Sequence, residues 1–265
     1  MSMSSRPHVA EQGRAAEPRA VPSQSMSTAD RQLSRWGGAA GLAGVGLMVG
    51  AVAVVVGFGL PDASDPETLT DFADIESGRI AEHFFYLGAL VLFALHVLVL
   101  QRLLTRVHPP AALFGAAVAA LGYAIMAAGS LLHVSTSPLA ELYESSDTPP
   151  DDLAAIEYAW HGAQSVFDTM LATGVLLVPI GILLFGLAMR HTQAFGPRLT
   201  ALTLALGGAG LIGAAVEIVD RGSVASAASV AAIVVFHASV GWRTLKLGND
   251  ESIDHPTPIE STPAH

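Results

Sequence analysis

The sequence of 265 residues contains no cysteine, and its only lysine is Lys246. Without cysteine, the chain cannot form disulfides, thiolate metal sites or iron–sulfur clusters, and it has no cysteine nucleophile. Histidine, carboxylate and methionine side chains are then the metal ligands that it can offer. Any metal or redox chemistry must therefore be sought among these groups.

Charged residues are also scarce: they form 14% of the chain, whereas hydrophobic residues form 51%. Soluble domains average about a quarter charged residues, and insertion into a lipid bilayer explains the deficit. The charges that are present sum to −10 at pH 7. Nucleic acid is not expected as a partner, because phosphate binding requires a basic surface.

Six apolar segments, each about as long as the ~20 residues that cross a bilayer, predict an all-α fold: a polytopic bundle of six transmembrane helices. The predicted ranges are Gly37–Leu60, Ile80–Gln101, Ala111–Leu132, Val166–Met189, Leu199–Val219 and Val224–Trp242. Residues 1–35 and 248–265 are predicted to be disordered tails around a transmembrane domain of residues 36–247. Ser27 and Asp30 have capping-box spacing, with Asp in place of Glu, and predict a short helix in the first tail.

The positions of Lys and Arg predict how this bundle is oriented. One side of it would hold Arg6, Arg14, Arg19, Arg31, Arg35, Arg102, Arg106, Arg190, Arg198, Arg243 and Lys246, and the other side Arg79 and Arg221. Cytoplasmic loops carry the excess of basic residues in membrane proteins. We therefore expect a multi-pass protein of the cell membrane with both termini in the cytoplasm and an acidic outer side.

Histidine and carboxylate side chains gather at the predicted outer ends of the helices. The candidate binding residues are His83, His133, Glu157, His161, Asp168 and Glu217. Four of these are candidate ligands for a divalent metal: His83, His133, His161 and Asp168. Ionisable residues in membrane spans indicate function by default, and these ligands suit Zn, Mn or Fe(II). The alternative is that they cap helix ends and pair with neighbours four residues away.

The segment Glu157–Asp168 has the most specific spacing of polar residues among these candidates. Glu157, His161, Gln164 and Asp168 follow one another at spacings of four, three and four. A helix would place all four on one stripe, with Trp160 turned elsewhere, and would lead straight into the fourth span. This stripe strengthens the case for a binding site, although helix capping and structural networks stay the favoured interpretation.

A second pair of histidines, His96 and His237, lies at matching depth near the predicted cytoplasmic ends of two spans. The pair could hold a haem axially, relay protons, or form a neutral hydrogen-bonded contact. Haem is the least favoured, because membrane proteins with bis-histidine haems often use four histidines and one clean pair is present here.

Glycines at GxxxG spacing, Gly37/Gly41 and Gly46/Gly50, mark the first span as a close-packing helix. Packing within the bundle and homo-oligomerisation through these faces are both consistent with this pattern.

The segment YAWHGAQSVFDTMLATGVLLVPIGILLFGLAMR, the Gly-rich fifth span and the closing FHASVGWRTLKL carry a family resemblance. With the topology, they make the chain similar to a family of small multi-pass membrane proteins of bacteria and archaea that is described as a domain of unknown function. The resemblance implies a six-helix integral membrane fold. It implies no activity, substrate or catalytic residue.

Three classes of function remain open. The sequence favours binding or transport of a small solute or ion through the outer polar residues, since it contains no catalytic motif. A membrane-embedded, metal-dependent enzyme that acts on a lipid-like substrate is the second class. A structural or accessory membrane subunit is the third.

Overall fold

The computed structural model describes residues 26–59, 69, 72–220 and 225–250, and within these ranges the regular structure consists of helices without any strand. Six of the helices are long and apolar enough to cross a membrane, which confirms the predicted all-α polytopic class. The helices are α1 (Thr28–Phe58), α2 (Phe72–Leu104), α3 (Pro109–Val134), α4 (Ser137–Glu144), α5 (Pro150–Met189), α6 (Gly196–Val219) and α7 (Ala225–Asn249).

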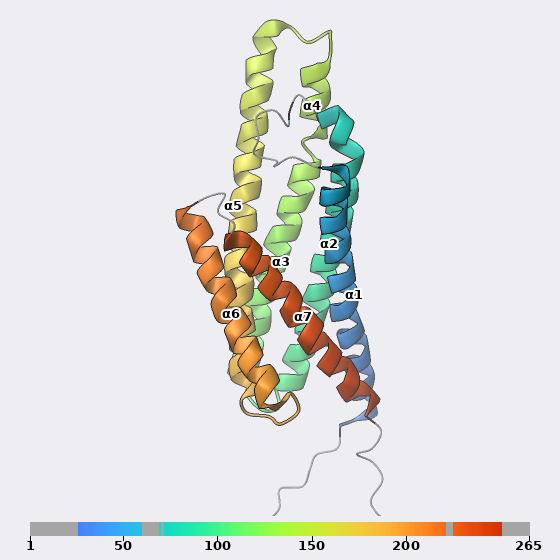
Figure 1. The fold of residues 1–265 in the computed structure, drawn as a ribbon, viewed down its shortest axis with the longest axis vertical. Helices are drawn as coiled ribbons and strands as arrows, with labels where there is room; N and C mark the ends of the chain where they lie inside the picture. The colour runs from blue at the N-terminus through green and yellow to red at the C-terminus, as the bar shows by residue number, and fades with distance from the viewer. Residues whose placement is uncertain (1–25, 60–68, 70–71, 221–224, 251–265) are drawn as a thin grey trace, which may run out of the picture.

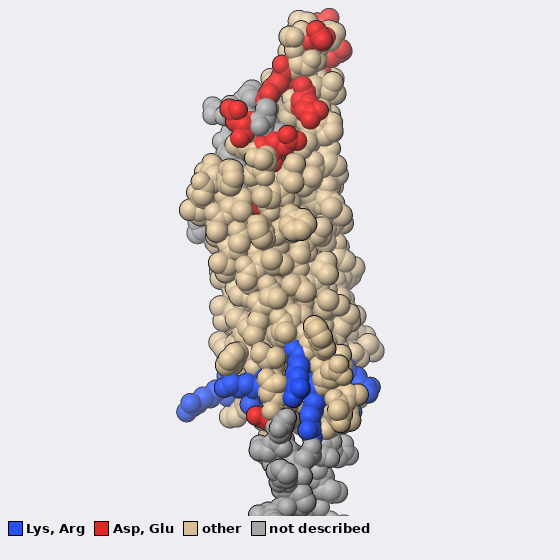
Figure 2. All heavy atoms as spheres, turned by 90° about the vertical axis from the view of Figure 1, so that its right-hand side faces the viewer, with Lys and Arg blue, Asp and Glu red and all other residues tan. Residues whose placement is uncertain are grey.

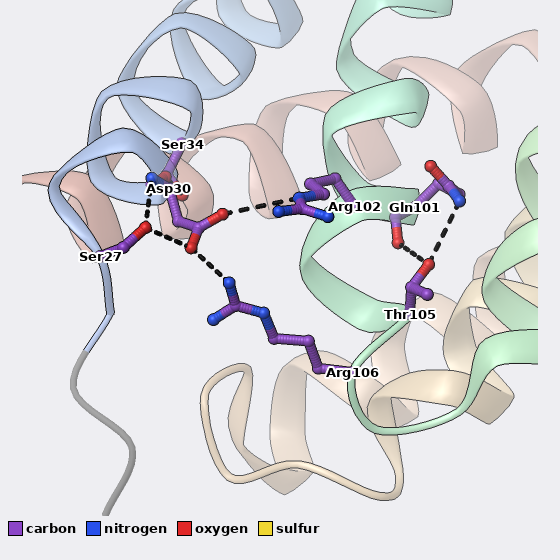
Figure 3. A network of polar contacts seen from close by, with 7 residues as sticks. All are labelled: Ser27, Asp30, Ser34, Gln101, Arg102, Thr105 and Arg106. Atoms are coloured by element: carbon purple, nitrogen blue, oxygen red, sulfur yellow. Dashed lines mark hydrogen bonds and ion pairs between the residues drawn. The ribbon is translucent and has the colours of Figure 1, made fainter.

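The first helix begins earlier than its apolar segment. The Ser27 hydroxyl accepts a hydrogen bond from the Asp30 backbone N–H at 3.1 Å and donates one to the Asp30 carboxylate at 2.6 Å (Figure 3). This cap supplies partners that the first turn lacks, so residues 28–35 are helical and belong to α1 rather than to a tail or a separate helix. Gly248 and Asn249 likewise belong to α7 and not to the second tail. The parts of the two predicted tails at residues 1–25 and 251–265 lie outside the described residues.

The contacts among the six long helices close into a ring. Each packs against its neighbour in the chain, and α7 returns to pack against α1. The start of α1 and the end of α7 therefore lie at the same end of the bundle (Figure 1), where Arg35 Nε donates to the Gly248 carbonyl at 2.8 Å. This hydrogen bond joins the start of α1 to the end of α7.

Glycines in α1 allow the ring to close. A Cβ at Gly41 would lie 2.7 Å from Nδ1 of His96 in α2, and a Cβ at Gly38 would lie 2.7 Å from the Gly241 carbonyl oxygen in α7. A Cβ at Gly46 would meet nothing within 4 Å. Gly38 and Gly41 thus serve packing inside the bundle, whereas oligomerisation through the outward Gly46 stays a prediction.

The longest helix, α5, has 40 residues. At 1.5 Å per residue it is about 60 Å long, against a hydrocarbon core of about 30 Å. Its first turns rise beyond the other helices, beside α4 (Figure 1). The predicted continuity of Glu157–Asp168 with the fourth span is confirmed, and α4 is an element that the sequence analysis did not predict.

Charged side chains divide between the two ends of the molecule (Figure 2). Lys and Arg gather at the end that holds the start of α1 and the end of α7, here called the basic end. Asp and Glu gather around α4 and the start of α5, here called the acidic end. The band between them presents almost entirely uncharged residues on the face that Figure 2 shows, and a bilayer fits this band.

Candidate functional site

Polar side chains from three helices meet near the acidic end. Nδ1 of His83 in α2 lies 2.8 Å from the Ser130 hydroxyl in α3, and the rings of His83 and His133 have centroids 4.6 Å apart. The Phe167 ring of α5 packs edge-on against His133 at 4.8 Å. Gln164, one turn before Phe167, lies beside His133. We call His83, Ser130, His133 and Gln164 the acidic-end cluster.

Most polar atoms of this cluster lack a hydrogen-bond partner. Nε2 of His83, both ring nitrogens of His133 and both amide atoms of Gln164 are buried without a partner of good hydrogen-bond geometry among the described residues. The Gln164 and His133 side chains are nevertheless close enough to interact with each other. The three residues are only 6%, 2% and 3% exposed. An unsatisfied buried polar group costs about 1–3 kcal/mol, and such groups are rare in folded proteins. A contact between Gln164 and His133 would satisfy one atom of each, which leaves Nε2 of His83 and the other atoms of these two side chains to a bound molecule.

An ion pair flanks the cluster on its outward side. Arg79 Nη1 lies 3.1 Å from Glu82 Oε2 one turn along α2, and Arg79 is buried. Arg79 also acts electrostatically on both His83 and His133. The pair brings one charge of each sign to the site, so the site suits a polar or ionic ligand of either sign.

The other sequence candidates are less buried than this cluster. His161 Nε2 lies 3.8 Å from Glu157 Oε1 on the outer part of α5, where Glu157 is exposed. Asp168 is exposed on the same helix, and Glu217 lies near the end of α6. The predicted stripe divides accordingly, because Gln164 turns inward with Trp160 while Glu157, His161 and Asp168 do not become buried.

This arrangement bears on the metal hypothesis. In the part of the chain that is described, no three or more His, Asp or Glu residues are placed to hold a metal ion. The four candidate ligands therefore do not converge: His83 and His133 are adjacent, and His161 pairs with a carboxylate of its own helix.

An apolar cluster lies beyond the acidic-end cluster, toward the acidic end. Trp160 of α5, Ala140 of α4 and Leu69 are buried against one another, with Leu139 and Tyr143 packed around them. Trp160 is one turn before Gln164, so it stands between Gln164 and the end of the bundle. We call this group the Trp160 plug.

The histidine pair lies deeper in the bundle. Nδ1 of His96 in α2 lies 2.8 Å from Nδ1 of His237 in α7, and Nε2 of His237 lies 2.6 Å from the Tyr123 hydroxyl of α3. Both histidines are fully buried, and the Phe93 ring stacks on His237 at 3.9 Å. The sequence predicted the common depth of the histidines. It missed Tyr123, although a buried tyrosine hydroxyl usually has a hydrogen-bond partner.

This geometry does not fit axial ligation of a haem. Two nitrogen–metal bonds of about 2 Å each would separate the ligand nitrogens by about 4 Å. Here the two Nδ1 atoms are 2.8 Å apart and bond to each other directly. In this arrangement the pair leaves no room for a haem iron between its nitrogens.

A third polar group, at the basic end, was not predicted (Figure 3). The buried Asp30 carboxylate receives a hydrogen bond from Arg106, and Nε of Arg102 lies 3.6 Å from it. Arg102 lies in the last turn of α2, and Arg106 follows the end of that helix. The network therefore fastens the start of α1 to the end of α2. Both carboxylate oxygens of Asp30 have partners within the chain, which identifies the network as a structural fastening.

A ring of six apolar helices with ionisable side chains buried between them defines an integral, multi-pass membrane protein. Residues 42–243 match the family described as a domain of unknown function, DUF4386, and the chain belongs to that family. The match runs from within α1 to within α7, so it includes all or part of each long helix, and it confirms the resemblance found in the sequence. No curated protein and no solved structure matches the chain.

Proposed function

We propose that this membrane protein binds a small hydrogen-bonding solute or ion at the acidic-end cluster, as a step in its transport. The observation that carries the proposal is the set of buried polar atoms without partners on His83, His133 and Gln164. Three helices hold these side chains around one point, and transporters commonly bind their substrates between helices inside the membrane. A purely structural network would satisfy its own buried atoms, as the Asp30 network does.

The charge distribution supports access from the acidic end. Asp74, Glu76, Glu141, Glu144, Asp147 and Asp151 are among the acidic residues of this end. Clefts and surfaces of one sign raise the local concentration of ions of the other sign. Cations are therefore the ligands that this end would concentrate near the cluster.

Three probes of different chemistry test the site: ammonium chloride, sodium formate and zinc chloride, each added to detergent-purified protein. A ligand that binds the folded state stabilises it by RT ln(1 + [L]/Kd), about 2.7 kcal/mol at one hundred times Kd. We expect at least one probe to raise the thermal unfolding midpoint of the wild-type protein. We expect His133→Ala and Gln164→Ala to abolish that increase.

The matched control is His161→Ala, which removes a histidine of the same helix as Gln164 that lies outside the cluster. It should respond to the probe like the wild-type protein. If no cation, anion or metal among the probes stabilises the wild-type protein, or if His133→Ala keeps the full response, the cluster is a helix fastening and solute binding is refuted.

We infer further that the basic end faces the cytoplasm of the cell membrane, which places both termini there. The separation of Lys and Arg from the acidic residues supports this orientation (Figure 2), because basic residues are retained on the cytoplasmic side.

The absence of cysteine makes the orientation directly testable. Single cysteines are introduced by Asp147→Cys, between α4 and α5, and by Gln193→Cys, between α5 and α6; the residues replaced are both exposed. A membrane-impermeant maleimide added to intact cells should label the first variant and leave the second unlabelled until the cells are lysed. The reverse pattern would mean that the basic end faces outward.

A further inference from the structure

An open groove lies at the basic end, between the end of α5 and the start of α6. Its volume is about 1010 Å³, and its walls come from the last residues of α5, the loop that follows and the first turns of α6. Ligand-binding clefts of proteins usually enclose about 300–1,000 Å³. The groove is therefore large enough for a lipid headgroup with part of its chains. We call it the α5–α6 groove.

The lining of this groove changes from polar to apolar along its length. Arg190 and His191 line its mouth, and both are exposed. Ala201 and Leu204 line the wall that α6 provides farther from the basic end. From Gly196 to Leu204, α6 advances about 12 Å at 1.5 Å per residue. The groove thus has a polar mouth at the basic end and an apolar wall that runs toward the uncharged band of the molecule.

The charged side chains around the groove are positive. Arg190 lines it, and the neighbouring Arg198 is exposed in the first turn of α6. Nε of Arg243 in α7 donates to the Ala194 carbonyl at 2.6 Å, which brings a third arginine to the loop between α5 and α6. Among the described residues that line the groove, none is Asp or Glu. A groove of one sign concentrates ligands of the other sign, so this one favours an anionic group.

A histidine adds a hydrogen-bond donor at the mouth. The rings of His191 and His108 have centroids 4.8 Å apart, and Nδ1 of His108 accepts a hydrogen bond from the Ala111 N–H at 3.3 Å. This hydrogen bond holds His108 at the start of α3, and the ring contact holds His191 beside Arg190. An imidazole always carries at least one N–H donor. Arg190 and His191 together therefore offer charge and hydrogen bonds to phosphate oxygens.

The two parts of the groove together indicate a lipid as the ligand. A small inorganic anion would contact the mouth and leave the apolar wall uncovered. A phospholipid with an anionic headgroup matches both parts, because its phosphate can lie at the mouth while an acyl chain covers the wall. Basic pockets between transmembrane helices are known to bind anionic lipid headgroups on the cytoplasmic side of membranes.

We propose that the α5–α6 groove is a binding site for an anionic phospholipid. The phosphate contacts Arg190 and His191, and an acyl chain lies along Ala201 and Leu204. The groove lies at the opposite end of the bundle from the acidic-end cluster and shares no side chain with it. Lipid recognition is therefore a function separate from solute binding.

Native mass spectrometry of the detergent-purified protein tests this site, with phosphatidylglycerol and phosphatidylcholine of identical acyl chains as probes. We expect the first phosphatidylglycerol molecule to bind more tightly than the first phosphatidylcholine molecule. Arg190→Gln should lower the phosphatidylglycerol affinity about fivefold, because one basic side chain near an anionic lipid surface contributes about 1 kcal/mol. Ala201→Trp should also lower this affinity, since the indole fills the apolar wall; Ala201 is exposed, so the fold can accept the larger side chain.

Lys246→Gln is the matched control, because it removes one positive charge at the basic end outside the groove. Lys246 lies over the Trp242 ring of α7, 5.1 Å from its centroid. This variant should bind phosphatidylglycerol like the wild-type protein. Equal wild-type affinities for the two lipids, or an unchanged affinity in Arg190→Gln, overturn the proposal. An equal loss in Lys246→Gln and Arg190→Gln overturns it too, because the lipid is then attracted to the basic end as a whole.

Sodium phosphate distinguishes a lipid site from a site for free phosphate. The thermal unfolding midpoint is measured in sodium phosphate and in sodium chloride of equal ionic strength, for the wild-type protein and for Arg190→Gln. We expect phosphate to give no stabilisation that depends on Arg190. A stabilisation by phosphate that Arg190→Gln removes would assign the groove to free phosphate and overturn the lipid proposal.

Discussion

Replacing Gly38 by alanine is expected to lower the free energy of unfolding by about 3 kcal/mol or more. A Cβ at this position would lie 2.7 Å from the Gly241 carbonyl oxygen and would also collide with the backbone nitrogen of Leu245. Both obstacles are main-chain atoms of α7, so no side chain can rotate away and the two helices must separate. Overpacking of a well-packed interior costs about 1–3 kcal/mol or more even where side chains can adjust.

The comparison variant is Gly46→Ala in the same helix. Its new methyl group would meet nothing within 4 Å, and alanine is favoured over glycine in helices by up to about 1 kcal/mol. Unfolding of both variants by sodium dodecyl sulfate in mixed micelles measures the difference. Equal effects of the two substitutions would contradict the packing of α1 on α7.

The double variant Arg102→Ala/Arg106→Ala should lose about 3 kcal/mol, more than Asp30→Asn, which should lose about 1 kcal/mol. The carboxylate is 6% exposed, whereas the two arginines are 61% and 46% exposed. Removing both cations leaves a buried charge uncompensated, which costs about 3–5 kcal/mol in buried pairs; the remaining bond to Ser27 places the effect at the low end. Removing the carboxylate leaves two arginines that water can solvate.

The triple variant Asp30→Asn/Arg102→Ala/Arg106→Ala completes the comparison, again by detergent unfolding. Because it no longer buries a charge, it should be more stable than the double variant. Additive losses across the three variants would show that the network of Figure 3 contributes no coupling energy.

The positions of the spans could be predicted because the bilayer imposes a length of about 20 apolar residues. The predicted segment Ala111–Leu132 lies within α3, Pro109–Val134. The polar residues before Val166 belong to the same helix as the fourth span, α5. The start of α1 was misplaced because the apolar run begins only at Gly37, while the cap at Ser27 extends the helix into polar sequence.

The side of each helix that is buried could not be predicted as well as the positions of the helices. A helix that is apolar on all sides gives no periodicity from which its buried face can be read. The sequence therefore grouped Gln164 with the exposed Glu157, whereas the structure turns Gln164 inward beside His133. The contacts of Tyr123 and Ser130 with histidines of other helices, more than forty positions away in the chain, depend on helix pairing and leave no local signal.

The Trp160 plug has a consequence for the speed of exchange at the acidic-end cluster. Trp160 is fully buried between α5 and the short helix α4, one turn beyond Gln164. A molecule that reaches Gln164 from the acidic end must displace this indole or the helix against it. For the solute binding proposed above, the opening of α4 would then limit the rate of entry, whereas a tight fit to the histidines would lengthen the residence time.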